Sequence, residues 1–176
     1  MNVVKPVFLP VLGVLGMAAV LLSLCGCGGG SGSDPAAQTV TTTGRFEPLA
    51  FMLTTRSVFQ QGEPVLLIFT VTNTSSKPVS YTVDRSGTAV IVSRGSQEVL
   101  SYRPLNAGVY IPPQQVILDG GETRTFTERW NQQDNEDRQV PPGKYSIRVF
   151  LDAGLLDGKP VPFKALSAEP VEVTIR

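Results

Sequence analysis

Two thiols are the side chains best suited to covalent chemistry in this chain, and both lie near its N-terminus, at Cys25 and Cys27. The chain of 176 residues contains no histidine. Without imidazole, the Ser-His-Asp and Cys-His nucleophile systems and histidine-ligated metal sites are excluded. Two cysteines are also too few for a cysteine-rich zinc site. We therefore expect a protein that is not an enzyme, with no catalytic residue, no cofactor and no metal ion.

The densest group of ionisable side chains is acidic and falls in residues 131–140. Its members are Asp134, Glu136, Asp137 and Arg138. A calcium loop of the EF-hand type needs a glycine in mid-loop and a distal glutamate, and neither stands at the required spacing. We therefore interpret the group as a solvated loop tip rather than a metal site. A carboxylate pair that meets only in the folded chain is the one enzymatic alternative, and no spacing points to it.

Charge and length limit the partners and the number of domains. The chain carries 15 basic and 15 acidic side chains, and its isoelectric point is near 6.3. This balance lacks the basic surface that nucleic-acid binding needs, so we expect no nucleic-acid partner. The length allows one domain with a tail.

An export signal is predicted for residues 1–26. Lys5 is the only charge before Asp34, and residues 6–24 form an uninterrupted apolar run. A short positive start followed by such a run is the plan of a secretory signal. Pro10 lies inside the run and no basic cluster follows it, which argues against a permanent membrane-spanning helix.

The end of this run, Leu24-Cys25-Gly26-Cys27-Gly28, resembles the lipobox of bacterial lipoproteins. The resemblance implies that a cysteine preceded by a small residue carries the lipid, and Gly26 supplies that residue for Cys27. We expect Cys27 to begin the mature chain and to anchor it to the bacterial cell envelope, at the outer membrane or the periplasmic face. Lipidation of Cys25, later cleavage of an ordinary signal peptide and a retained signal anchor are the alternatives.

Residues 27–44 are predicted to be a flexible tether, because they are rich in glycine, serine and threonine and poor in apolar side chains. Such a tether would hold residues 45–176 near a membrane but not within it. The N-terminal lipid would then be the only contact with the membrane.

Residues 45–176 are predicted to be an all-β domain. Apolar residues recur at every second position in many short segments, among them residues 65–71 and 145–151. In the first of these, Leu66 and Ile68 make the other face apolar as well, which indicates a central strand. Glycine and proline separate these segments, and no stretch of ten residues keeps a helical period. We expect an antiparallel immunoglobulin-like β-sandwich of about 7–9 strands. Trp130 is expected to be a core anchor.

Two blocks of this domain carry a resemblance to a known family. The first spans residues 53–79 and includes the turn Gly62-Glu63-Pro64, and the second spans residues 121–145 and ends in Pro-Pro-Gly-Lys-Tyr. Together they resemble the BsuPI family of intracellular proteinase inhibitors. The resemblance implies a small β-sandwich whose partner is a protein, namely a protease, bound without chemistry of its own. Residues 81–105 depart from the family's pattern.

The candidate partner-binding loop is residues 152–170. A loop of this length in a compact domain is usually functional or conceals a hairpin. Apolar side chains on a proline-stiffened loop suit a partner's groove, because rigidity lowers the entropy lost on binding. The candidate contact residues are Leu155, Leu156, Val161, Phe163 and Leu166. The alternative is that Phe163 and Leu166 cover an open sheet edge.

Two functions remain after these exclusions. The first is a lipid-tethered inhibitor that contacts a protease through residues 152–170 and residues 131–140. Replacing residues 155–166 by a Gly/Ser linker is then expected to abolish inhibition and to leave unfolding cooperative. The second is a structural or adhesive immunoglobulin-like envelope lipoprotein without inhibitory activity.

Overall fold

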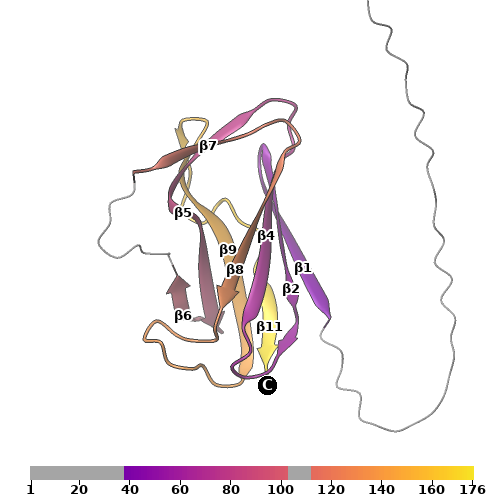
Figure 1. Ribbon diagram of the computed structural model, residues 1–176, viewed down its shortest axis with the longest axis vertical. Coiled ribbons are helices and arrows are strands. Elements are labelled where there is room, and N and C mark those ends of the chain that lie inside the picture. The colour runs from indigo at the N-terminus through magenta and orange to yellow at the C-terminus, as the bar shows by residue number, and fades with distance from the viewer. Residues whose placement is uncertain (1–37, 103–111) are drawn as a thin grey trace, which may run out of the picture. The chain divides into compact units, whose positions relative to one another are not determined.

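The computed structural model describes residues 38–102 and 112–176, and the regular structure in these two ranges is all β-strand (Figure 1). Eleven strands of this described part form two sheets. The first sheet has the order β1-β2-β4-β8 and consists of β1 (Thr39–Phe46), β2 (Leu49–Arg56), β4 (Val65–Asn73) and β8 (Thr123–Trp130). The second sheet consists of β3 (Val58–Phe59), β5 (Val79–Arg94), β6 (Gln97–Tyr102), β7 (Gln114–Leu118), β9 (Gly143–Leu156), β10 (Lys159–Pro160) and β11 (Val171–Ile175).

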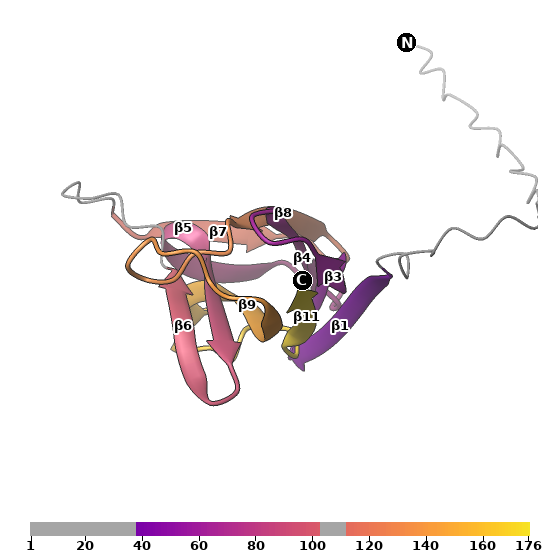
Figure 2. The same ribbon diagram turned by 90° about the horizontal axis from the view of Figure 1, so that it is seen from below.

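The second sheet follows the order β3-β11-β9-β5-β6, with β7 paired to β5 and β10 paired to β9. All pairings are antiparallel except that of β11 with β3. β1 and β6 lie on opposite sides of the sandwich (Figures 1 and 2). The all-β, antiparallel sandwich predicted from alternation is confirmed. The strands outnumber the prediction partly because β3 and β10 have two residues each, which is too short for alternation to reveal.

The core lies between the two sheets and follows the predicted alternation. On β4, Val65, Leu67, Phe69 and Val71 are buried, while Leu66 and Ile68 point away from the second sheet. The rings of Phe51 and Phe69 stack with centroids 6.0 Å apart. Alternating side chains of one strand therefore supply both the core and an outer face.

Trp130 is buried as predicted, and it packs edge-on against Tyr145 with ring centroids 5.4 Å apart. The indole N–H of Trp130 donates to the carbonyl oxygen of Gln133 at 2.8 Å. The Tyr145 hydroxyl donates to the carbonyl oxygen of Pro141, four residues upstream. This contact has the geometry of the tyrosine corner of immunoglobulin-type sandwiches. It fixes the start of β9 against the loop that precedes it.

The first strand begins earlier than the sequence analysis allowed. β1 starts at Thr39, so the predicted tether of residues 27–44 is wrong for residues 39–44. Threonine favours strands, and an edge strand needs backbone pairing more than apolar side chains. β1 pairs along its whole length with β2, and the carbonyl oxygen of Thr43 accepts from the N–H of Glu169 at 3.0 Å. A Cβ on Gly44 would collide with the backbone of Ser167, so only glycine fits there.

The predicted export signal and its lipid site, residues 1–26 and Cys27, lie outside the described residues. Over the two described ranges, no helix is long and apolar enough to cross a membrane.

Candidate functional site

Two loops meet at one end of the sandwich, and a buried side chain joins them. They are the β2–β4 connection, which includes β3, and the β8–β9 connection, and both lie at the lower end in Figure 1. Gln132 of the second connection is 0% exposed. Its Oε1 accepts from the N–H of Gly62 at 2.8 Å, and its Nε2 donates to the carbonyl oxygens of Gln60 at 2.8 Å and Glu63 at 2.6 Å. Gln132 therefore ties the two loops together from inside.

The local backbone explains how Gln132 reaches this position. Its φ of 59° and the φ of 81° at Gly62 are left-handed, so each loop turns sharply at the residue where the two are joined. The carbonyl oxygen of Gln132 accepts from the N–H of Val140 at 2.8 Å, and Gln133 forms an isolated bridge with Gln139. The loop is closed on itself as a short hairpin.

The tip of the β8–β9 loop is organised by Asp134. Its carboxylate accepts from the backbone N–H groups of Glu136 and Arg138 and from the Arg138 Nε, each at 2.9 Å. Burial acts to raise the pKa of Asp134, but the hydrogen bonds from Arg138 and Glu136 outweigh it and hold the pKa below its ordinary value. Because the Asp134 carboxylate bonds within its own loop, the acidic group is a structured tip.

Asn135 attaches this tip to the edge of the second sheet. Its backbone N–H donates to the carbonyl oxygen of Val99 at 3.1 Å, and its Oδ1 accepts from the N–H of Ser101 at 3.0 Å. Both partners lie on β6. The loop is thus held at its base by Gln132 and at its tip by Asn135, while Glu136, Asp137 and Arg138 stay exposed.

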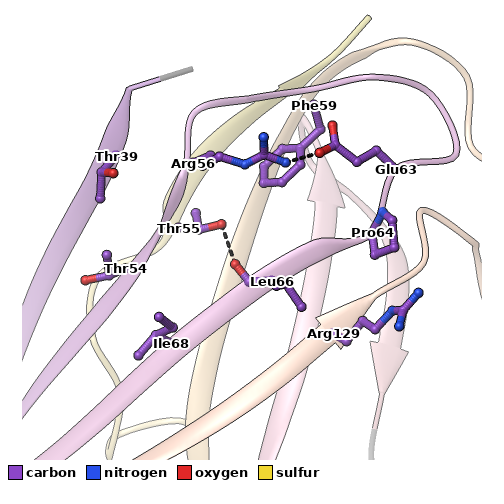
Figure 3. Close-up of a pocket in the computed structure, with 10 residues that line it drawn as sticks. All are labelled: Thr39, Thr54, Thr55, Arg56, Phe59, Glu63, Pro64, Leu66, Ile68 and Arg129. Carbon is purple, nitrogen blue, oxygen red and sulfur yellow. Dashed lines mark hydrogen bonds and ion pairs between the residues drawn. The ribbon is translucent and has the colours of Figure 1, made fainter. Parts of the chain in front are cut away.

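A groove of about 520 Å³ opens beside this end, on the outer face of the first sheet (Figure 3). Leu66 and Ile68 of β4 form its apolar floor and are 54% and 46% exposed. The Arg56 guanidinium forms an ion pair with Glu63 at one rim and lies over the Phe59 ring, 4.5 Å from its centroid. The groove is also lined by Thr39, Thr54, Thr55, Pro64 and Arg129. Such a lining can bind an apolar partner but holds no activated nucleophile.

The Glu63 carboxylate predicts a pH dependence of stability. Hydrogen bonds from Arg56 and from the N–H of Gln60 lower its pKa from the ordinary value. A folded pKa below the unfolded one, about 4.3, means that the charged form stabilises the fold above that pH and that this contribution disappears as the pH falls through the folded pKa. Urea unfolding should therefore find Glu63→Gln less stable than wild type at neutral pH, with the gap closing in acid. Glu172→Gln, an exposed glutamate on β11, is the control, and a gap for Glu63→Gln that stays constant into acid would contradict this origin.

The first part of the predicted partner-binding loop, residues 152–160, is a hairpin rather than a loop. β9 continues to Leu156, and Leu155 and Leu156 pair with Thr82 and Tyr81 of β5. A turn with left-handed Asp157 and Gly158 then leads into β10. The hairpin that the sequence left open as an alternative is therefore present. It was not visible in the sequence because the length of β9 is set by pairing with a distant strand.

Burial divides the five candidate residues. Leu156 and Leu166 are buried in the core, at 6% and 1% exposed, so neither can enter a partner's groove in this fold. Val161 is half-buried against the same core. Leu155 and Phe163 are exposed, so a role for them in partner contact stays a prediction.

Phe163 has a visible structural partner. Its ring packs edge-on against Phe150, with centroids 5.2 Å apart, and Phe150 forms a small cluster with Ala89 and Ile91. Leu166 lies beside β9, because its carbonyl oxygen accepts from the N–H of Leu151 at 2.9 Å. The segment after β10 thus covers part of the second sheet, close to the alternative that Phe163 and Leu166 act as a cover.

Comparison with known proteins bears on these surfaces. The family model BsuPI, described as intracellular proteinase inhibitor, matches residues 52–155, which is more than half of the chain. The match includes Gln132, the β8–β9 loop and most of the groove, and it ends before Leu156, Val161, Phe163 and Leu166. A search of the curated proteins found no match.

Solved structures with a similar fold are distant in sequence. A β-glucosidase from Listeria innocua is 14% identical, with 80% of this chain and 16% of that chain covered and a TM-score of 0.40. An alkylpurine DNA glycosylase from Pseudomonas fluorescens is 14% identical, with 68% and 27% covered and a TM-score of 0.39. The CARDB domain of a Pyrococcus furiosus protein is 14% identical, with 78% and 93% covered and a TM-score of 0.38. The chain therefore spans a small part of the glucosidase and most of the CARDB domain.

Proposed function

The chain belongs to the BsuPI family of intracellular proteinase inhibitors, and from this premise we propose that its β-sandwich inhibits a protease by binding alone. The observation that carries the proposal is the β8–β9 loop, whose base is tied by Gln132 and whose tip is tied by Asn135. A loop held in one conformation loses little entropy when a partner binds. It needs no catalytic group, because blocking a cleft is sufficient.

The contact residues in this proposal are the exposed tip residues Glu136, Asp137 and Arg138. With Asp134, the tip carries three carboxylates and one guanidinium. A protease with basic residues around its cleft would complement this charge, and complementary charge mainly raises the association rate. The exposed side chains of Leu155 and Phe163 are the other candidate contacts.

The test is an inhibition assay on the full chain, purified in a mild detergent, against a panel of serine and cysteine proteases. We expect at least one protease to be inhibited. The double variant Glu136→Gln/Asp137→Asn should slow association roughly tenfold at low salt and much less at high salt. The matched control Glu172→Gln removes an exposed carboxylate from β11 and should leave association unchanged. Unaffected protease rates at micromolar protein would instead favour the structural or adhesive envelope function.

We further propose that a lipid on Cys27 tethers the domain to the cell envelope after residues 1–26 are removed. The support is the apolar run that ends at a cysteine preceded by Gly26. The target proteases would then be envelope or secreted enzymes rather than intracellular ones.

Mass spectrometry of the mature N-terminus tests the tether. The expected product begins at Cys27 with the added mass of its lipid, Cys27→Ser abolishes that mass, and the neighbouring variant Cys25→Ser keeps it. Lipid that persists in Cys27→Ser, or an unmodified N-terminus beyond residue 27, would refute the assignment.

A further inference from the structure

The outer face of the first sheet has an unusual composition. We call the side chains of β1, β2, β4 and β8 that point away from the second sheet the threonine face. Threonine occupies alternate positions on both edge strands, namely Thr39, Thr41, Thr43, Thr123, Thr125 and Thr127. Threonine is neutral and small, so covering it with a partner removes no charge from water.

Apolar side chains lie in the middle of this face. Ile68 is paired with Thr54 on one side and Thr127 on the other, and Leu66, two residues along β4, forms the floor of the groove with it. Met52 on β2 is 41% exposed. Large apolar side chains gathered on one face indicate an interaction surface more than singly scattered ones do.

The charges that the strands place on the threonine face are all positive. Arg45 and Arg56 form ion pairs with the loop residues Glu47 and Glu63. Arg129 lies opposite Leu66 and donates from its Nε to the Asn131 side-chain oxygen at 3.0 Å. Among the described residues, no carboxylate pairs with Arg129. Its charge is therefore free to meet an anion.

The first strand of the described residues contributes to this face. Thr39 is the first residue of β1 and also lines the groove. Cys27 lies twelve residues before it in the sequence. A chain of this length spans at most about 40 Å, so the rim of the groove stays within that distance of the membrane surface.

We propose that the threonine face docks on the phospholipid bilayer that holds the anchor, with Leu66, Ile68 and Met52 between the headgroups and Arg129 on lipid phosphates. The inference rests on the proposed lipid at Cys27, because the tether supplies the high local concentration that makes a small apolar surface sufficient. The sequence analysis expected the lipid to be the only membrane contact, and the threonine face adds a second. Docking also holds the β8–β9 loop, which follows Arg129, near the membrane.

The experiment places a fluorescent reporter on the face of the full, lipidated chain. Thr127→Cys is exposed and neighbours Ile68, whereas Glu98→Cys lies on β6, in the other sheet. Each variant is labelled with NBD and reconstituted into vesicles of phosphatidylethanolamine and phosphatidylglycerol with brominated acyl chains. Cys25 leaves with the signal and the Cys27 sulfur is alkylated, so the reporter is the only free thiol. We expect quenching at position 127 and none at position 98.

Substitutions then separate the apolar and the charged contributions. Leu66→Thr with Ile68→Thr should lower the ratio of docked to undocked protein roughly hundredfold. Ile117→Thr, whose isoleucine is 54% exposed on β7, is the matched control and should leave the ratio unchanged. Arg129→Gln should lower it about fivefold on anionic vesicles and not on phosphatidylcholine.

Three results would overturn the proposal. They are equal quenching at positions 127 and 98, quenching at position 127 that survives Leu66→Thr with Ile68→Thr, and a signal at position 127 that rises with protein density without lipid, which would assign the face to a second copy. Mass spectrometry of the same sample measures separately whether Cys27 carries a lipid. An unmodified Cys27 would refute both the proposed anchor and the proposed docking. An unquenched reporter on a lipidated chain would refute the docking alone.

Discussion

Replacing Gln132 by alanine is expected to lower the free energy of unfolding by about 3 kcal/mol, because this buried side chain makes three hydrogen bonds to the backbone of another loop, each worth about 1 kcal/mol. The variant removes the acceptor of the Gly62 N–H and one donor to each of the carbonyl oxygens of Gln60 and Glu63. The Gln60 carbonyl oxygen keeps the N–H of Glu63 as a donor, at 3.0 Å. Urea unfolding at neutral pH, followed by tryptophan fluorescence, measures the loss, since Trp130 lies two residues away.

The matched control is Gln139→Ala in the same loop. Gln139 is exposed, and its side chain donates one long hydrogen bond of 3.3 Å to Gln132. Its removal should change the free energy of unfolding by no more than about 0.5 kcal/mol. Equal effects of the two variants would mean that Gln132 does not join the loops as described.

The same pair of variants tests the proposed function. If the β8–β9 loop contacts a protease, loosening its base raises the entropy lost on binding, so Gln132→Ala should weaken inhibition even where the protein is still folded. Gln139→Ala should inhibit like the wild type. Full inhibition by folded Gln132→Ala would place the contact surface elsewhere.

The core could be predicted from sequence because strand burial is a local, periodic signal. The apolar residues at every second position of residues 65–71 and 145–151 are buried in the structure, and Trp130 is buried as expected. The period of two arises from the pleat of a single strand, so it can be read without knowing which strands pair.

Gln132 could not be predicted, because nothing local distinguishes a buried glutamine from the exposed glutamines around it. Its burial depends on partners in residues 60–63, some 70 positions earlier in the chain. The extension of β9 to Leu156 likewise depends on β5, and the start of β1 at Thr39 depends on β2. Each of these errors concerns pairing with another segment of the chain, which the residues of one segment do not reveal.

The exposure of the groove floor, Leu66 and Ile68, could not be predicted from the sequence either. Leu66 and Ile68 make the second face of β4 apolar, and the sequence analysis took this as the sign of a central strand. Apolar residues on both faces are typical of a strand covered on both sides. β4 is central in its sheet, yet its outer face carries no covering element among the described residues.

Replacing Leu166 by alanine is expected to cost about 3 kcal/mol, as large-to-small changes in a packed core do. Leu166 is 1% exposed and packs in the main core, and its carbonyl oxygen holds the N–H of Leu151. Phe163→Ala is the matched comparison, because Phe163 lies three positions before Leu166, is 57% exposed and makes an aromatic contact with Phe150. Phe163→Ala should lower the free energy of unfolding by about 1 kcal/mol, which is the typical contribution of an aromatic pair in addition to the burial of its surface.

The burial of Leu156 and Leu166 also corrects the expectation that residues 155–166 can be exchanged for a Gly/Ser linker without loss of the fold. That exchange removes both Leu156 and Leu166, which together exceed about 5 kcal/mol, against a total stability of about 5–15 kcal/mol for a domain. We therefore expect the linker variant to lose cooperative urea unfolding, and a cooperative transition near the wild-type midpoint would show that the segment is dispensable.

Inhibition measured on Phe163→Ala then separates packing from partner contact. The variant keeps the buried residues of the segment and removes only its largest exposed side chain. If the β8–β9 loop alone binds the protease, Phe163→Ala should inhibit like the wild type while Gln132→Ala weakens. A loss of inhibition that exceeds the loss of stability in Phe163→Ala would move the binding surface to the second sheet, where Leu155 is the other exposed candidate.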